Sequence, residues 1–423
     1  MMIANSLVAA TDSVSDLLAR TGAGVIPDDN TEMERLQAHL MVCVYAKDAS
    51  GVRSIFSKSD TDKLIASLGA PRYFPVHTAA VADSGAVLNA LVDILPAELL
   101  DTRDENGLTP LMCAARHGHV AAIHTLLAGK ASADATDQSG YSALMWAAMS
   151  GFVDAVKVLL GYEVYADDGV HPLGIDRQDK NGDTALMLAI RAGHYDVVEA
   201  LVARRANINV ANAAGERALS VAVSLGRRRA IRLLCEQRDI DLNAVDRAGL
   251  TVMMRAADYA DRTYDSSILN LLIGQNARTD LKDRDGCSAL LRAAKGKSDI
   301  AIEHLIAGGA DIHATDSKGC TAVALAAKHN NLYGLRFLLK QRGVRIDARD
   351  DSGRTPLFHA VEAEHYDIVN ELILHGADSR LSYTVIDGTV LTLAQHRGDR
   401  RMVKLLLGNG AGNDVKDTAA LAG

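Results

Sequence analysis

Hydrophobic residues in the stretch 107–129 follow two successive helical patterns separated by a short polar break. The apolar positions are Leu111, Ala114, Ala115, Ile123, Leu126 and Leu127. Spacings of three and four residues put the side chains of each pattern on one face of a helix. Thr109-Pro110 is typical of a helix N-terminus, and Gly118 lies where the first helix should end. The stretch predicts two short amphipathic helices that need a neighbour to bury their apolar faces.

The same arrangement returns along most of the chain. Its copies begin at Gly107, Gly140, Gly182, Gly215, Gly249, Gly286, Gly319, Gly353 and Gly388. Subtraction of these residue numbers gives spacings of 33, 42, 33, 34, 37, 33, 34 and 35 residues. A recurring unit of this length predicts a repeat architecture, in which each unit contacts only its neighbours.

The copies resemble those of the ankyrin-repeat family over roughly four-fifths of the chain, because a period near 33 accompanies a Thr-Pro-Leu-His-x-Ala core in that family. The copy at Gly107 reads Thr-Pro-Leu-Met-Cys-Ala. The resemblance implies an all-α repeat solenoid of about nine clear repeats, plus degenerate N-terminal repeats, with helix-turn-helix units and β-turn fingers. Methionine replaces the family's histidine at Met112, Met145, Met187 and Met254. Methionine cannot make that histidine's hydrogen bonds, so the family's polar network between repeats is not expected in full.

Three segments are predicted. Residues 1–70 form an N-terminal helical cap or eroded repeats, residues 71–413 form the ankyrin array, and residues 414–423 form a disordered tail. Within the array, Phe74–Leu95 reads as a degenerate repeat because it keeps Val-His-Thr-Ala-Ala. Two insertions break the period, one within Gly161–Gln178 and a shorter one after Asp258. Long loops often carry function, so the first insertion is either a binding element or surface decoration.

Composition limits the classes of partner and compartment. The net charge of −8 argues against nucleic-acid binding, which needs a positive surface. Five scattered cysteines without a Cys-x-x-Cys pair favour a reducing compartment. The sequence contains no stretch of about 18 apolar residues, so no membrane span is expected. We therefore expect a monomer in the cytoplasm, with cytoskeletal association or a nuclear location as alternatives.

Catalytic and metal chemistry find little support in the sequence. Cys113, His117, His119 and His124 lie close together, but His119 occupies the Gly-His step where the family uses histidine for loop hydrogen bonds. A zinc site needs three or four converging ligands, and no other repeat supplies them by pattern. P-loop, kinase, Gly-x-Ser-x-Gly and His-Glu-x-x-His motifs are absent from the sequence. We expect a non-enzyme without cofactor, catalytic residue or metal.

The resemblance instead implies a scaffold that binds a protein partner through the concave helix face and the β-turn fingers. A cytoskeletal or structural adaptor is the alternative, and it would use the same surface. Aromatic, methionine and arginine side chains concentrate binding energy at interfaces. The candidate partner-binding residues of the early repeats are Tyr141, Trp146, Met149, Tyr162, Tyr165 and Arg191. Trp146 has a second interpretation, as a core residue.

A second candidate contact is basic. Arg227, Arg228 and Arg229 follow one another just before a predicted second helix. On an acidic protein, such a cluster is either a site for an acidic partner or an ordinary solvated face.

Overall fold

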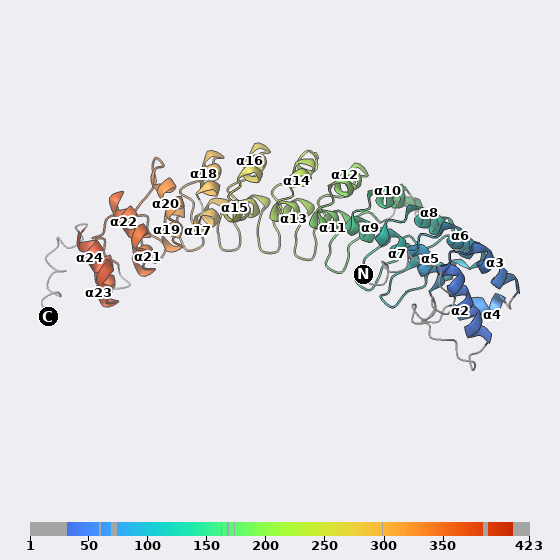
Figure 1. Ribbon diagram of the computed structural model, residues 1–423. Coiled ribbons are helices and arrows are strands. Elements are labelled where there is room, and N and C mark those ends of the chain that lie inside the picture. The colour runs from blue at the N-terminus through green and yellow to red at the C-terminus, as the bar shows by residue number, and fades with distance from the viewer. Residues whose placement is uncertain are drawn as a thin grey trace. The chain divides into compact units, whose positions relative to one another are not determined.

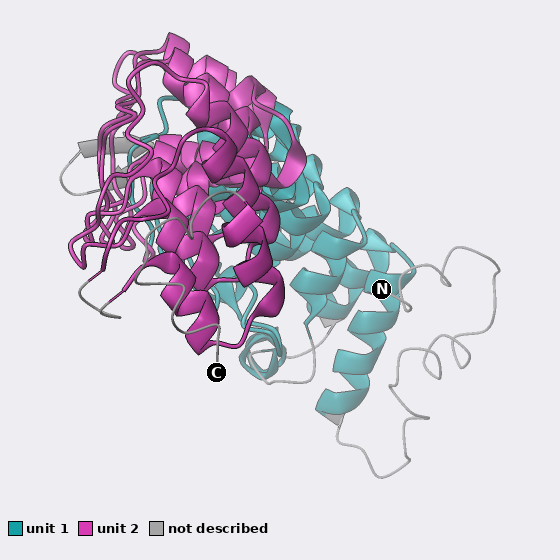
Figure 2. Ribbon diagram, turned by 90° about the vertical axis from the view of Figure 1, so that its left-hand side faces the viewer, with its two compact units in different colours: residues 1–212 teal, residues 213–423 magenta. Residues whose placement is uncertain are grey.

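A computed structural model describes the chain over eight segments. These are residues 32–58, 61–68, 74–161, 163–166, 169–172, 174–297, 299–383 and 388–408. The chain divides into two compact units, residues 1–212 and 213–423, which Figure 2 shows in different colours. The predicted tail, and the first 31 residues of the predicted cap, lie outside the described residues.

Unit 1 is built from short helices joined in pairs (Figure 1). Its elements are α2 (Glu32–Tyr45), α3 (Ala49–Lys58), α4 (Thr61–Ser67), α5 (Pro75–Val81), α6 (Gly85–Ile94), the 3-10 helix η1 (Ala97–Asp101), α7 (Pro110–His117), α8 (Val120–Ala128), α9 (Ala143–Ser150), α10 (Val153–Gly161), β1 (Glu163–Ala166), β2 (Gly169–Pro172), α11 (Ala185–Ala192) and α12 (Tyr195–Ala203). The segment that was predicted as a degenerate repeat forms the pair α5 and α6.

Unit 2 continues the same alternation of first and second helices (Figure 1). Its helices are α13 (Ala218–Ser224), α14 (Arg228–Cys235), α15 (Val252–Thr263), α16 (Ser267–Gly274), α17 (Ala289–Lys295), α18 (Ile300–Ala307), α19 (Ala322–Lys328), α20 (Leu332–Leu339), α21 (Pro356–Glu362), α22 (Tyr366–Leu374), α23 (Val390–His396) and α24 (Arg400–Gly408). The all-α repeat architecture predicted from the sequence is confirmed.

Within each unit the core is a row of stacked first helices. In unit 1, α7 packs between α5 and α9, and in unit 2, α17 packs between α15 and α19. Alanines such as Ala114 and Ala294 are fully buried there, and their small side chains let neighbouring helices approach closely. The longest described helix, α2, has 14 residues. Over the described segments, no helix has the length and apolar character that crossing a membrane requires.

The ends of the first helices follow directly from the sequence. The Thr109 hydroxyl accepts a hydrogen bond from the backbone N–H of Met112, which caps α7. Gly118 ends the helix in the left-handed region, at φ 74°. Gly140, in the following finger, has φ 85°. A Cβ at Gly140 would also lie 3.0 Å from the backbone nitrogen of Lys180 in the next finger, so only glycine fits.

At two of the four positions where methionine replaces the family's histidine, the sulfur accepts a hydrogen bond. The backbone N–H of Thr109 donates to the Met112 sulfur at 3.5 Å, and Thr251 donates to Met254 at the same distance. Both bonds lie within one repeat. Polar contacts between repeats come from elsewhere, as when Nδ1–H of His119 donates to the carbonyl of Ala80 at 2.8 Å. His119 therefore has the structural role predicted for it.

The two insertions take different forms. The first contains an antiparallel hairpin, in which Glu163 pairs with Pro172 and Ala166 with Gly169. The sequence analysis assigned no secondary structure there, although valine and tyrosine favour strands. The second insertion lengthens a first helix, because α15 has 12 residues whereas α13 and α17 have seven each. Tyr264 ends α15 with φ 57°.

Replacing a buried leucine should loosen the array locally. Leu290 on α17 is completely buried, so Leu290→Ala should lower the free energy of unfolding by about 2–5 kcal/mol. Because each repeat contacts only its neighbours, hydrogen exchange should increase mainly in α15–α19. The control is Leu374→Ala, since Leu374 is 67% exposed and should change stability by less than about 0.5 kcal/mol. Equal loss of protection along the whole chain would contradict the prediction.

Acid should destabilise the first repeats of unit 1 through His77. This side chain is buried, and its Nε2–H donates to the Leu108 carbonyl at 2.9 Å. Burial lowers the pKa of His77 below its usual 6.5, so the unfolded chain binds the proton more tightly than the folded chain. The stability that neutral His77 contributes is complete above about pH 6.5 and falls by at most about 1.4 kcal/mol per pH unit below it.

The measurement is urea unfolding between pH 7.5 and pH 5, with hydrogen exchange of α5 and α7 as the local readout. His77→Gln keeps an N–H donor but cannot titrate, so it should flatten the pH dependence of this region. His124→Gln, at an exposed position of α8, is the matched control. A pH dependence that His77→Gln leaves unchanged would assign it to other groups.

Candidate interaction surface

In four of the described repeats, a finger aspartate positions one side chain of the following first helix. In the finger before α9, Oδ1 of Asp137 accepts the backbone N–H groups of Ser139 and Tyr141 at 2.8 and 2.9 Å. Its second oxygen accepts Nε1–H of Trp146, nine residues further on, at 3.1 Å. The equivalent pairs in unit 2 are Asp246–Arg255, Asp283–Arg292 and Asp350–His359. The turn and the helix are therefore locked together by one carboxylate.

Trp146 lies at the centre of an aromatic and cationic cluster in unit 1. Its ring centroid is 5.3 Å from that of Tyr141, with the two planes tilted by 37°. The guanidinium of Arg116, from the preceding first helix α7, lies 4.9 Å from the indole centroid. Trp146 and Tyr141 are partly buried, while Arg116 is exposed. Trp146 is therefore only partly buried, and its core and partner-binding interpretations both stay predictions.

Arg191 lies on α11, the next first helix of the row. Its Nε donates to Oδ2 of Asp183 at 3.0 Å, and 40% of the arginine side chain is exposed. Asp183 is nearly buried, and its other oxygen accepts Nδ2–H of Asn212 at 2.8 Å. This fixed carboxylate holds the guanidinium in one orientation, which reduces the entropy that a partner's binding would cost.

Burial and nearby finger carboxylates both act on the hydroxyl of Tyr141. Partial burial raises the pKa of its hydroxyl, and the carboxylates of Asp179 and Asp183 raise that pKa further. The phenol therefore stays protonated and can donate a hydrogen bond at neutral pH. Met149, one turn after Trp146 on α9, is also partly buried. We call Arg116, Tyr141, Trp146, Met149 and Arg191 the Trp146 surface.

Tyr162 and Tyr165 are the candidate partner-binding residues of the first insertion. Tyr162 lies outside the described residues, so its candidate role stays a prediction. Tyr165 belongs to β1, where its backbone pairs with Val170. A binding role of the Tyr165 side chain likewise stays a prediction.

The three consecutive arginines lie in unit 2, at the start of the second helix α14, as predicted. Arg227 is the N-cap residue of α14, and the helix itself begins at Arg228. Arg228 forms an ion pair with Asp265, which reduces the net positive charge of this segment. Arg229 is exposed in the first turn of the helix. A site for an acidic partner at these arginines stays a prediction.

One group of potential metal ligands occurs among the described residues, in unit 2. Cys320, Asp350 and His359 place a sulfur, an oxygen and a nitrogen within 4.8 Å of one another. The side chains of Asp350 and His359 are 6% and 3% exposed, and Cys320 is buried. Burial raises the pKa of the Cys320 thiol to about 11, and burial lowers the pKa of His359. This group cannot be recognised from the sequence pattern, because its members lie in two different repeats.

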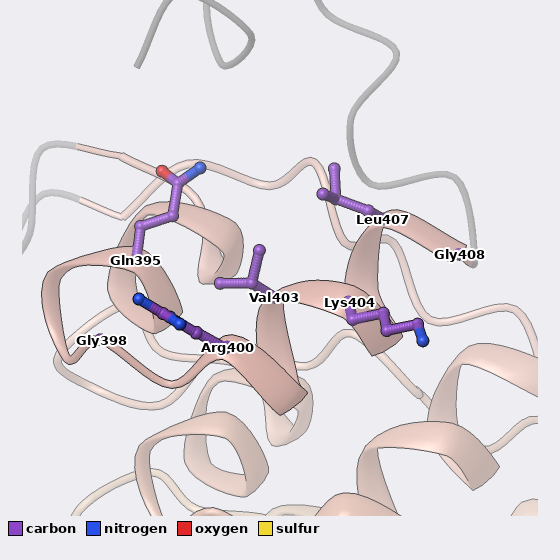
Figure 3. A pocket seen from close by; sticks show the side chains of 7 residues that line it. All are labelled: Gln395, Gly398, Arg400, Val403, Lys404, Leu407 and Gly408. Carbon is purple, nitrogen blue, oxygen red and sulfur yellow. The ribbon is translucent and has the colours of Figure 1, made fainter. Parts of the chain in front are cut away.

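A pocket of about 730 Å³ lies at the last described helix pair. It is lined by Gln395, Gly398, Arg400, Val403, Lys404, Leu407 and Gly408 (Figure 3). Val403 and Leu407 supply apolar atoms, while Arg400 and Lys404 on the same helix supply charge. In the earlier pairs of unit 2, the corresponding face packs against the next pair along the row.

Comparison with known proteins identifies the repeat. The family model described as ankyrin repeats in three copies matches seven overlapping stretches of the chain. These are residues 40–132, 76–169, 123–212, 169–246, 253–350, 290–383 and 342–419. The chain belongs to the ankyrin-repeat family. Ankyrin repeats generally mediate protein–protein interaction, so the coarse functional class follows from this membership.

Several curated proteins are similar to parts of this ankyrin array. The B-cell lymphoma 3 protein homolog of Mus musculus is 31% identical over 155 residues, which cover 36% of this chain and 34% of that protein. The Homo sapiens neurogenic locus notch homolog protein 1 is 35% identical over 154 residues, 36% of this chain and 6% of that protein. Delta-latroinsectotoxin-Lt1a of Latrodectus tredecimguttatus is 41% identical over 106 residues, 24% and 9% respectively. The matched part spans about a third or less of each relative.

Among solved structures, the crystal structure of the ankyrin repeat domain of Bcl-3 is 25% identical to this chain. The match covers 52% of this chain and 94% of that domain, with a TM-score of 0.45.

The candidate residues Tyr141, Trp146, Met149 and Arg191 lie in one region of unit 1, and their role in binding stays a prediction. Tyr141, Trp146 and Arg191 were proposed together, and the structure brings Tyr141 into ring contact with Trp146. Arg116 was not connected to Trp146, because the two lie 30 positions apart in the sequence. The nine-residue spacing from Asp137 to Trp146 was a readable signal, since the same spacing recurs in three later repeats.

The fluorescence of Trp146 should report this surface directly, because it is the chain's only tryptophan. Arg116→Ala removes the guanidinium that covers the indole, so acrylamide quenching should increase and the emission maximum should shift to the red. Stability should change by less than about 0.5 kcal/mol, since Arg116 is exposed. Arg53→Ala is the matched control. Arg53 is an exposed arginine on α3 that pairs with Asp93 on α6, away from the indole in the sequence. Identical quenching in wild type and Arg116→Ala would contradict the contact.

Proposed function

We propose that this protein is a non-enzymatic interaction scaffold that binds a protein partner through the Trp146 surface. The observation that carries the proposal is the partly buried indole, held by Asp137 and flanked by Tyr141 and Arg116. Tryptophan, tyrosine and arginine are the side chains that most often dominate the energy of protein interfaces. The cluster lies on fingers and first helices, as the sequence analysis expected for an ankyrin array.

The charges of the surface favour a particular kind of partner. Arg116 is exposed without a carboxylate in ion-pair contact among the described residues, whereas Arg191 shares its charge with Asp183. The carboxylates of Asp137 and Asp183 are occupied by hydrogen bonds from the scaffold itself. The preferred partner segment therefore presents a carboxylate to Arg116 and an apolar side chain to the indole and Met149. Arg–carboxylate pairs of this kind give orientation as well as energy.

The cytoskeletal or structural adaptor remains the alternative reading of the same surface. It differs from a general scaffold in the identity of the partner and not in the residues used. Capture of partners from the native cell, followed by their identification, separates the two. A filament protein that binds through the Trp146 surface would favour the adaptor.

The double variant Arg116→Glu with Met149→Ala tests the surface. It replaces the exposed cation by an anion and removes the adjacent apolar side chain. Affinity for the captured partner should fall at least tenfold, about 1.4 kcal/mol, while the melting temperature stays nearly unchanged. Titration followed by Trp146 fluorescence and by calorimetry measures both effects.

Lys157→Glu is the matched charge reversal. Lys157 lies on the second helix α10, and 62% of its side chain is exposed. This variant should bind the partner like the wild type. Equal affinity of the double variant and the wild type would place the interface on another surface and overturn the proposal.

A further inference from the structure

We propose that Cys320, Asp350 and His359 form a binding site for one divalent transition-metal ion of the zinc type. Nε2 of His359 lies 2.9 Å from Oδ2 of Asp350, and Sγ of Cys320 lies 3.8 Å from the same oxygen. All three ligand atoms lie within 4.8 Å of one another. The inference concerns unit 2 and is independent of the function proposed for the Trp146 surface.

The dimensions suit a tetrahedral ion. With Zn–N and Zn–O bonds near 2.0–2.2 Å and Zn–S near 2.3 Å, tetrahedral angles separate the ligand atoms by roughly 3.3–3.7 Å. The observed separation of nitrogen and oxygen is a little shorter than this, and that of sulfur and oxygen is slightly longer. Changes below about 1 Å in side-chain position would make the three atoms converge on one ion, and water would supply the fourth ligand.

The backbone around the three residues is already fixed. Oδ1 of Asp350 accepts the backbone N–H groups of Ser352 and Arg354, which leaves Oδ2 facing the cysteine and the histidine. The two adjacent fingers are joined by a hydrogen bond from the backbone N–H of Asp351 to the carbonyl of Lys318, at 3.0 Å. The ligand-bearing segments therefore need no rearrangement before an ion binds.

The contact between Asp350 and His359 resembles contacts in other repeats that serve only to hold the structure together. Other finger aspartates hold Trp146, Arg255 or Arg292 in the same way. Indole and guanidinium nitrogens only donate hydrogen bonds, so those pairs cannot bind a metal. Imidazole has a lone pair for a cation, and Cys320 adds a thiol beside it. This combination of three ligands is found once in the described repeats.

Charge balance favours a divalent cation at this depth. Binding releases the Cys320 proton to solvent as the metal–sulfur bond forms. The resulting thiolate, together with the Asp350 carboxylate, neutralises the two positive charges, so no net charge remains buried. The imidazole of His359 stays neutral in the complex. Asp316 and Glu362 add negative charge nearby.

Two features oppose the ion and limit its affinity. Lys328 lies close enough to act electrostatically on Cys320 and His359. Nδ1 of His359 is buried and has no hydrogen-bond partner in the described structure, although a metal on Nε2 places the ring proton there. We therefore expect weaker binding than at a closed structural zinc site. Lys328→Gln should raise the affinity for the metal ion a few-fold. If the three residues do not bind metal, this substitution should have no such effect.

The experiment is a Co²⁺ titration of the full chain under reducing conditions, followed by displacement with Zn²⁺. Wild type should bind one Co²⁺ with an intense sulfur-to-cobalt charge-transfer band and the visible absorption of a tetrahedral ion. Excess Zn²⁺ should abolish both signals and raise the melting temperature. Cys320→Ser should lose the charge-transfer band, and His359→Gln should weaken binding at least tenfold while keeping an N–H donor to Asp350.

Cys287→Ser is the matched control. Cys287 follows the leading glycine of the preceding repeat, just as Cys320 follows the leading glycine of its own repeat. In the repeat after Cys287, however, Leu325 occupies the position that corresponds to His359. This variant should bind Co²⁺ like the wild type. Circular dichroism checks the fold of each variant, and Asp350→Asn serves if His359→Gln does not fold. Absence of saturable binding by the wild type at submillimolar metal, or a charge-transfer band retained by Cys320→Ser, would overturn the proposal.

Discussion

The burial of apolar faces by neighbouring helix pairs is the constraint on which the rest of this protein depends. A first helix of seven or eight residues, such as α7 or α17, is too short to be stable alone, and its alanine face is buried only when another first helix covers it. Close approach requires small side chains along the stack. It also requires that each repeat be rotated and shifted by a similar amount relative to the preceding repeat, and we call this displacement the offset. The offset then decides which polar side chains meet at the exposed edges.

The finger aspartates convert this stacking into a defined surface. In four of the described repeats, one oxygen holds the turn and the other holds a side chain nine residues later, so that side chain is oriented beside the next finger. In unit 1 that group is Trp146, and in unit 2 it is an arginine or His359. The same local device therefore produces an aromatic surface at one repeat and a cluster of metal-ligating atoms at another. The chemistry depends only on which side chain occupies the position.

The insertions show what the stack tolerates. Extra residues after α10 form a hairpin outside the helical rows, and extra residues in α15 continue the helix beyond its neighbours. Neither interrupts the packing of first helices, because both additions leave the buried faces unchanged. Variation is thus confined to edges and surfaces of the helical rows.

The sequence by itself determined the repeat, its helices and its turns. The period, the Thr109 cap and the positive-φ glycines depend on contacts within a few residues, so they can be read in order along the chain. The contact of Arg116 with Trp146 and the meeting of Cys320 with His359 were decided by tertiary structure. These contacts join residues 30 or more positions apart, and they depend on the rotation and offset between neighbouring repeats. The period gives the number of repeats but does not fix the offset between neighbouring repeats. That offset is set by how the side chains of adjacent repeats pack against one another.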